Sequence, residues 1–242
     1  MGQGFETTDW TLVRTARAGD DQGAQAALAR LCGNYWLPLY AYVRHLGHSP
    51  DDAADLVQGF FTALLEKDYL KQVDPEAGRF RTFMLSSLKN YLANERAKQR
   101  TQKRGGDTVM VPLDSRHAER LAKSDSFDAA TPEDVFHRRW ARTVVDRALA
   151  RLQEERAAVG KAQEFELLSS HLTGEEPHTP YRELAARLGT TEGALRVAVH
   201  RLRTQFGEIL RHEIRQTVLR PQDIDREVRE LLSTLGVVEL AS

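Results

Sequence analysis

The chain has 242 residues, of which 41% are hydrophobic and 29% charged, so it can bury a sizeable core and is not a disordered polymer. No stretch approaches the roughly 18 uncharged apolar residues of a membrane span, and the N-terminus lacks a basic start followed by an apolar run. The single cysteine, Cys32, excludes an internal disulfide and a cysteine zinc site and suits a reducing compartment. We therefore expect a cytoplasmic protein of one or two domains, without a membrane anchor or secretory signal.

The net charge of −1 hides opposed blocks of charge. Residues 79–104 carry eight basic residues and one acidic residue, whereas residues 105–135 carry three basic and seven acidic ones. Residues 221–242 carry two basic and five acidic residues. A basic stripe within an otherwise acidic chain indicates a surface that binds a polyanion.

The periodic patterns of the N-terminal half are helical, and no run of alternating β-branched residues predicts a strand. The first helix is expected at residues 9–18. A second helical pattern covers residues 21–46, and we expect a break in it near Gly33 and Pro38, because both residues are unfavourable inside a helix.

The third predicted helix begins after Ser49 and ends near Lys67. Ser49 is its expected N-cap, Pro50 takes the first helical position, and acidic residues fill the first turn, where they stabilise the positive end of the helix dipole. A turn at residues 74–78 separates this helix from another that begins near Phe80.

The C-terminal half repeats this logic after an acidic segment, residues 107–130, that shows little periodicity and that we interpret as a linker. Helices are expected at 133–158 and 160–172, followed by a loop. A last helix is expected after Arg220 and Pro221, with an apolar stripe that either packs back on the preceding domain or binds a partner.

A short helix from Tyr181, closed by Gly189, a tight turn capped by Thr191 and a second helix together have the pattern of a helix-turn-helix. The second helix places apolar residues on one face; its other face carries Glu192, Arg196, His200 and Arg203. Arginine suits a DNA-reading face, because its guanidinium donates two hydrogen bonds to a guanine edge. The alternative is an ordinary helical hairpin with a solvated basic face.

Two patterns in the N-terminal half carry further chemistry. Asp52 and Asp55 share one face of the third helix, and this face is either a docking surface for a basic partner or a plain acidic helix start. In the next helix Phe80 fits the apolar stripe, whereas Phe83 and Tyr91 lie off it among the basic residues. Exposed aromatic rings and cations together are typical of a surface that binds single-stranded nucleic acid.

Taken in order, these motifs resemble the extracytoplasmic-function (ECF) sigma factors of bacterial RNA polymerase, within the sigma-70 family. The residues that carry the resemblance are Asp52-Ala-Ala-Asp-Leu-Val-Gln58, Phe80-Arg-Thr-Phe83 with the basic segment up to Arg104, and Tyr181 to Arg203. The resemblance covers roughly residues 8–104 and 133–216.

The resemblance implies an all-α fold with two helical domains joined by an acidic linker. Residues 1–104 would form a sigma region-2-like bundle, residues 105–132 the linker, and residues 133–216 a region-4-like helix-turn-helix domain. Residues 217–242 would form a C-terminal helical extension.

The resemblance also implies site residues and partners, and neither a cofactor, a metal nor an enzymatic activity. The clamp helices of the largest subunit of the core polymerase would dock on Asp52, Asp55, Leu56 and Gln58. The melted minus-ten strand of the promoter would be held by Phe83, Lys89, Asn90, Tyr91, Asn94, Arg96, Lys98, Arg100, Lys103 and Arg104. The minus-thirty-five duplex would be read by Thr191, Glu192, Arg196, His200, Arg201 and Arg203.

The chain departs from the family pattern at several of these positions. Ala54 and Gly59 stand where the family usually has glutamates, so core docking is expected to be weaker. In the segment that melts and reads the minus-ten element, Phe83 replaces a tryptophan and Asn94 an aspartate. Thr62 shares the face of Asp55 and Gly59, and a phosphate there would restore negative charge. We therefore predict Thr62 as a regulatory phosphorylation site, the alternative being an ordinary helix threonine.

Three other functions compete with a promoter-directing factor. A stand-alone helix-turn-helix regulator would bind duplex DNA tightly without core polymerase. A nuclease is disfavoured because Glu95 is the lone carboxylate in the basic segment. A protein that only sequesters polymerase would need no strand-binding surface. The sequence leaves open whether an anti-sigma factor, a Ser/Thr kinase, the C-terminal extension or expression control regulates the chain.

Overall fold

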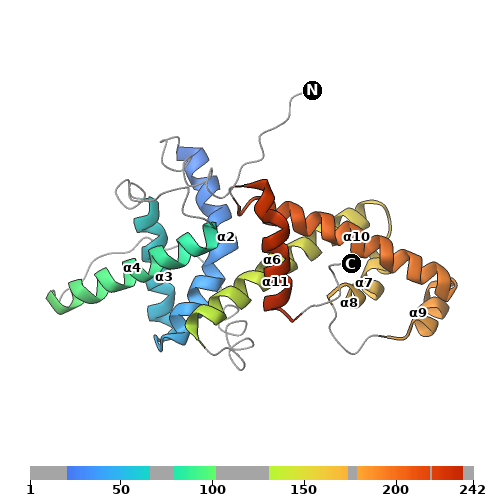
Figure 1. The fold of residues 1–242 in the computed structure, drawn as a ribbon, viewed down its shortest axis with the longest axis horizontal. Coiled ribbons are helices and arrows are strands. Elements are labelled where there is room, and N and C mark those ends of the chain that lie inside the picture. Colours follow the sequence, from blue (N-terminus) through green and yellow to red (C-terminus); the bar gives the residue numbers. More distant parts are fainter. Residues whose placement is uncertain (1–20, 66–78, 102–130, 174–178, 219, 237–242) are drawn as a thin grey trace. The chain divides into compact units, whose positions relative to one another are not determined.

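The computed structural model describes residues 21–65, 79–101, 131–173, 179–218 and 220–236 (Figure 1). Every regular element within these ranges is helical, which confirms the predicted all-α class. The predicted helix at 9–18 and the predicted acidic linker, up to residue 130, lie outside the described residues. None of the described helices combines the length and apolar composition that a bilayer crossing requires.

The chain divides into two compact units. One comprises residues 1–140 and 215–221, and the other comprises residues 141–214 and 222–242. The predicted domain boundaries stay predictions.

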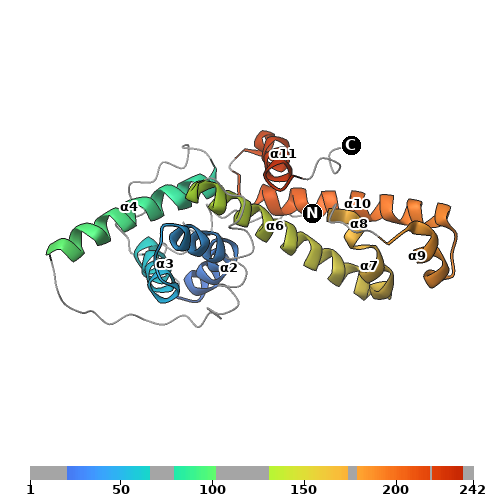
Figure 2. The same cartoon turned by 90° about the horizontal axis from the view of Figure 1, so that it is seen from below.

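The first unit is built on three helices, α2 (Asp21–His45), α3 (Pro50–Leu65) and α4 (Phe80–Thr101). All three pack against one another and lie side by side in Figures 1 and 2. Their core is rich in aromatic rings, which bury large apolar areas; fully buried members include Tyr35, Leu39, Tyr40, Phe60, Leu64, Phe80, Met84 and Leu88. The burial of Phe80 confirms its predicted place in the apolar stripe.

The expected break in the second helix is wrong, because α2 runs without interruption through Gly33 and Pro38. A proline inside a helix lacks one backbone donor and costs roughly 3 kcal/mol against alanine. Around Pro38 the side chains of Tyr35, Leu39 and Tyr40 are fully buried. We infer that this tertiary packing outweighs the local preference for a break.

Matching caps start α3 and α6 (Pro132–Ala158). The Asp52 amide donates to Ser49 Oγ over 3.1 Å, and Ser49 Oγ donates to the Asp52 carboxylate over 2.6 Å. Thr131 and Asp134 repeat both contacts, and the Thr131 amide also donates to the Asp134 carboxylate. The predicted cap at Ser49 is thus confirmed. Each acid accepts a hydrogen bond from the hydroxyl of its cap residue, and the bond from the Thr131 amide to Asp134 has the pattern of a capping box.

The second unit contains α6 from Ala141 onward, α7 (Ala162–Leu168), α8 (Ser170–Thr173) and α9 (Tyr181–Leu188). It continues through α10 (Glu192–Arg215) up to Ile214, and α11 (Ile224–Thr234) follows the single 3-10 turn of η3 (Pro221–Asp223). The helix expected at 160–172 is therefore two short helices. Its core includes buried residues of α6, α7, α9 and α10, among them Leu152, Phe165, Leu168, Leu184, Leu195, Val199, Leu202 and Phe206.

The C-terminal helix α11 is amphipathic, and its apolar stripe is buried. Val228, Leu231 and Leu232 are at most 9% exposed. Arg211 of α10 and Asp225 of α11 form an ion pair, with the Nε–Oδ1 distance at 3.4 Å, and Figure 2 shows the two helices beside each other. These contacts agree with the interpretation that the last helix packs back on the second unit.

Candidate functional site

The acidic start of α3 presents Asp52 and Asp55 to solvent. The cap at Ser49 fixes this turn, because its hydroxyl holds the Asp52 carboxylate. Leu56 and Gln58 are half-buried, and the side-chain nitrogen of Gln58 is buried, without a hydrogen-bond partner among the described residues. Of the four predicted docking residues, the structure therefore exposes the two acids most fully.

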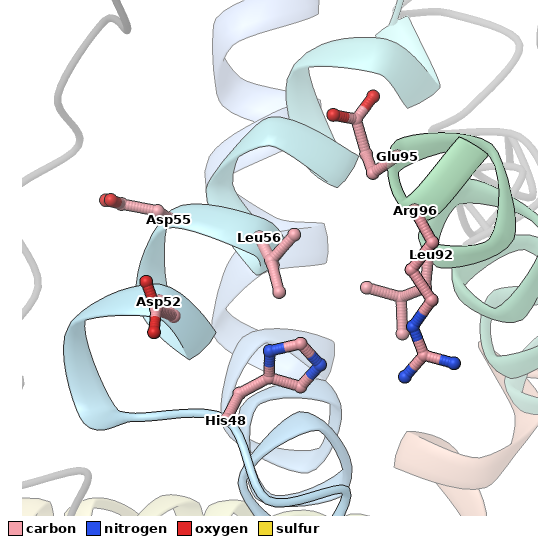
Figure 3. A pocket seen from close by; sticks show the side chains of 7 residues that line it. All are labelled: His48, Asp52, Asp55, Leu56, Leu92, Glu95 and Arg96. Carbon is pink, nitrogen blue, oxygen red and sulfur yellow. The ribbon is translucent and has the colours of Figure 1, made fainter. Parts of the chain in front are cut away.

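A pocket of about 340 Å³ lies between the start of α3 and the second half of α4 (Figure 3). Leu56 and Leu92 face each other in its middle, and Asp52 and Asp55 lie on the α3 side, opposite Arg96 on α4. Its lining is completed by His48 and Glu95. The pocket thus has an apolar centre, with Asp52 and Asp55 on its α3 edge and the oppositely charged pair Glu95 and Arg96 on its α4 edge. Its α3 edge and Leu56 belong to the predicted docking residues, whereas Arg96 on the opposite edge is a predicted strand-binding residue.

The basic helix α4 exposes a row of polar and cationic side chains. Asn90, Asn94, Arg96 and Lys98 are exposed, and Lys98 pairs with Glu95 over 2.8 Å. Amides that hydrogen-bond base edges and cations that contact phosphates suit a nucleic-acid strand. Three further predicted contacts cannot be placed: the described side chains do not include Arg100, and Lys103 and Arg104 lie outside the described residues.

The two off-stripe aromatic residues of α4 are half-buried rather than freely exposed. The ring of Phe83 lies 5.6 Å from that of Phe80, and the ring of Tyr91 lies 5.9 Å from that of Phe60 in an edge-to-face arrangement. The Tyr91 hydroxyl occupies space that a Cβ at Gly59 would need, since the two would be 2.4 Å apart. Base stacking on either residue stays a prediction. For a base to stack on the full face of either ring, the aromatic side chain would have to move.

Lys89 of α4 is paired within the first unit. Its Nζ lies 2.5 Å from the Glu133 carboxylate and 6.0 Å from the centre of the Tyr42 ring. The hydrogen bond between Lys89 and Glu133 raises the pKa of Lys89 and lowers the pKa of Glu133. Burial raises the pKa of Tyr42. A phosphate that contacted Lys89 would therefore compete with the Glu133 carboxylate.

A buried cation lies near the start of α4. Arg81 is 5% exposed, and its guanidinium carbon lies 4.6 Å from the centre of the Trp140 ring. Its Nη1 lies 3.5 Å from Nδ1 of His137. Burial and the charge of Arg81 together lower the pKa of His137. This cluster contributes to packing between α4 and the start of α6, because its arginine is hidden from solvent.

In the second unit, α9 and α10 form a helical pair joined by a short turn. Gly189 adopts a left-handed conformation, with φ at +63°, and the Thr190 amide donates to the Ala185 carbonyl, which closes α9. Thr191 Oγ1 accepts a hydrogen bond from the Ala194 amide over 3.2 Å. The predicted cap at Thr191 is therefore confirmed, and it fixes the first turn of α10.

The predicted duplex-reading residues of α10 fall into two groups. Glu192, Arg196, His200 and Arg201 are exposed, as is the cap residue Thr191. Arg203 is half-buried, and its Nε and Nη2 both donate to the carbonyl of His171, over 3.2 and 3.0 Å. The guanidinium of Arg203 thus ties α10 to α8, and its predicted role on DNA would compete with these two bonds.

Several residues were missed by the sequence reasoning. His48 lines the pocket, and Tyr181 lies under Arg196, whose guanidinium carbon is 5.1 Å from the ring centre. Val197 is 50% exposed on α10. The exposure of Val197 could have been predicted from its position in the helical repeat. The pocket position of His48 and the contact of Tyr181 with Arg196 could not, because both depend on residues distant in the sequence.

Two other predictions concern single sites. Thr62 is exposed on α3, where its hydroxyl donates to the Gln58 carbonyl over 3.2 Å. A modifying enzyme would therefore find this side chain at the surface, and phosphorylation stays a prediction.

In the described part of the chain, no group of three histidine, cysteine or carboxylate side chains lies close enough to hold a metal ion.

Comparison with known proteins bears on the first unit. Residues 34–102 match the family described as Sigma-70 region 2, a range that covers the C-terminal half of α2 and all of α3 and α4. No curated protein and no solved structure matches the chain. The family match supports a member of the sigma-70 family, whose sigma factors are non-enzymatic and act in transcription initiation with RNA polymerase core.

Proposed function

We propose that this chain is an ECF-type sigma factor, which binds bacterial RNA polymerase core and directs it to specific promoters. One observation carries the proposal: the residues that match Sigma-70 region 2 form the C-terminal half of α2 together with α3 and α4, and these packed helices expose an acidic surface and a basic one. Such a unit can bind a basic protein surface and a polyanion at the same time.

The acidic surface is the start of α3. Asp52 and Asp55 are exposed and share one helix face, so two cations on one partner helix can reach both. We assign this surface to the clamp helices of the largest polymerase subunit. Leu56 adds a half-buried apolar contact beside the pocket.

The basic surface is the exposed row on α4. Capturing a melted strand offsets the cost of unstacking bases, which is about a few kcal/mol per step. Asn90 and Asn94 supply amides for base edges, and Arg96 and Lys98 supply cations for phosphates. We assign these residues to the non-template strand of the minus-ten element.

The duplex-reading element is the pair α9 and α10. The capped first turn of α10 and its exposed face of Arg196, His200 and Arg201 suit a helix in a major groove. We assign this pair to the minus-thirty-five element. A factor that reads two elements of one promoter gains affinity from linking them.

Binding of the full chain to purified bacterial core tests the acidic surface. In Asp52→Asn/Asp55→Asn both charges are lost, but an amide oxygen remains at residue 52 to accept the Ser49 bond. We expect binding roughly tenfold weaker, because each ion pair at the edge of an interface contributes up to about 1 kcal/mol. The matched control is Glu154→Gln/Glu166→Gln, which neutralises two exposed acids in the second unit.

The same assay separates this proposal from its competitor. Equal affinity of the two double variants for core would contradict docking through Asp52 and Asp55. No binding of core by the unaltered chain, with tight binding of duplex DNA by the chain alone, would establish the stand-alone regulator instead.

A further inference from the structure

We propose that Val197 is a specificity-determining residue, whose side chain contacts the C5-methyl group of a thymine in the major groove of the minus-thirty-five duplex. The inference rests on the proposed function, because it takes α10 as the helix that reads DNA. Val197 belongs to none of the predicted DNA contacts, and the argument for it comes from its place on α10.

The first step is the direction in which Val197 points. Leu195 and Val199, two residues before and after it, are each 2% exposed and belong to the core. Because an α-helix turns about 100° per residue, a residue two positions from each of them lies on the opposite side of the helix. Val197 is therefore at the centre of the exposed face, where a groove-bound helix comes closest to the bases.

The second step is that this valine differs from the other exposed apolar side chains. Among the described residues, the large hydrophobic side chains that are exposed are Leu46, Val159 and Val197. Leu46 and Val159 lie in turns after helices, whereas Val197 lies inside a helix. Single exposed apolar residues are common. Val197 differs from Leu46 and Val159 because it lies among basic residues on the helix that is the candidate for reading DNA.

The third step concerns the space around Val197. One turn earlier lie Gly193 and Ala194, and a Cβ built at Gly193 would meet no atom within 4 Å. One turn later lies Arg201, which is exposed, and His200 is exposed beside it. Gly193, Ala194 and Val197 therefore form a small, apolar part of this face, and the polar side chains of His200 and Arg201 follow it.

The fourth step is that Arg196 and Arg203, the two other arginines of α10 that were predicted to read DNA, lie toward the flank. The guanidinium of Arg196 lies over the Tyr181 ring, and that of Arg203 is bound to the His171 carbonyl. By helical position both are roughly a quarter turn from Val197 toward the buried side. Val197 is thus the side chain that a base pair under the centre of α10 would meet first.

The chemistry of the major groove then selects the ligand. Every base pair presents hydrogen-bond donors or acceptors in the major groove, and base pairs that contain thymine also present an apolar group, the C5-methyl. A valine has no hydrogen-bonding atom in its side chain, so its favourable contact is with that methyl. Cytosine, which lacks the methyl group and presents an amino donor, would leave the valine without a matching partner.

The test uses the full chain with bacterial core polymerase and a library of duplexes randomised upstream of the start site. We expect the selected sequences to share a thymine in the upstream element. Each shared thymine is then replaced by deoxyuridine, which removes only the methyl group. At one position the affinity should fall about fourfold, the value for one methyl group withdrawn from an apolar contact.

The variant Val197→Ala, combined with the deoxyuridine replacement, completes a double-mutant cycle between protein and DNA. Val197→Ala should bind the thymine duplex more weakly than the unaltered chain, and for this variant the deoxyuridine replacement should change affinity by less than about twofold. Val159→Ala removes the same atoms from an exposed valine in a turn, and it should keep the full response to deoxyuridine.

Each outcome bears on one proposal or both. If a sequence is selected but no deoxyuridine replacement weakens binding, or if Val197→Ala responds as strongly as the unaltered chain, the role of Val197 is overturned and the proposed function stands. If no sequence is selected with core present, both are overturned.

Discussion

At the scale of single residues, Gly59 of α3 packs against the side chain of Tyr91 on α4. A Cβ at residue 59 would lie 2.4 Å from the Tyr91 hydroxyl and 3.4 Å from the ring carbon that bears it. Glycine inside a helix costs roughly 1 kcal/mol against alanine. The absence of a side chain at this position is thus explained by the tyrosine that packs against it.

Because of this contact, we predict that the effect of Gly59→Ala on the free energy of unfolding changes sign when Tyr91 is also substituted. Gly59→Ala alone should lower the free energy of unfolding, since overpacking costs about 1–3 kcal/mol and exceeds the gain in helix propensity. In a Tyr91→Phe background the closest atom is gone, and Gly59→Ala should instead raise stability by up to about 1 kcal/mol. Urea unfolding of the four full-length proteins measures both effects.

Gly33→Ala is the matched control, because Gly33 also lies inside a helix and a Cβ there would meet nothing within 4 Å. It should have the same effect whether residue 91 is tyrosine or phenylalanine. A stabilising Gly59→Ala in the unaltered background would show that the tyrosine does not restrict residue 59.

At the scale of elements, the contact between α4 and the start of α6 contains a histidine that favours its neutral form. Burial and the charges of Arg81 and Arg79 lower the pKa of His137, and the carboxylates of Asp134 and Glu133 oppose them. The guanidinium of Arg81 can only donate, so its contact with Nδ1 also requires that nitrogen to be unprotonated.

The sign of the pH dependence follows from linkage. Below the ordinary histidine pKa of 6.5 the unfolded chain gains a proton that the folded chain resists, until pH reaches the lowered folded value. The contribution of His137 to stability is therefore full above pH 6.5 and declines as pH falls below it. We predict that His137→Gln loses less stability than the unaltered chain between pH 7.5 and 5.5, measured by urea unfolding. Equal losses in the two proteins would contradict a lowered pKa.

The elements also show what a sequence can and cannot predict. The caps at Ser49 and Thr191 follow from local chemistry, and the structure confirms both. The expected break near Pro38 is wrong, because buried rings around it hold the helix together. The pocket beside Leu92 and the contact of Tyr91 with Gly59 join residues more than thirty positions apart, so no local pattern predicts them.

At the scale of the whole molecule, the all-α class and most helix positions could be predicted from periodicity and turn residues. The acidic start of α3 and the basic row of α4 could be predicted as candidate surfaces from charge patterns alone. Their close packing around one pocket could not, because it depends on how α2, α3 and α4 fold together. Both surfaces lie within the residues that match Sigma-70 region 2, and the proposed function assigns them to one role.

The most direct test of that role is run-off transcription by purified bacterial core polymerase on a library of upstream sequences from the source genome. The reactions contain no added chain, the full chain, or its Asp52→Asn/Asp55→Asn variant. We predict transcripts that require the chain, begin downstream of a shared pair of spaced sequence elements, and decrease with the variant. Transcripts that are the same with and without the chain, under conditions where a known sigma factor directs initiation, would contradict the proposal that it directs polymerase to promoters.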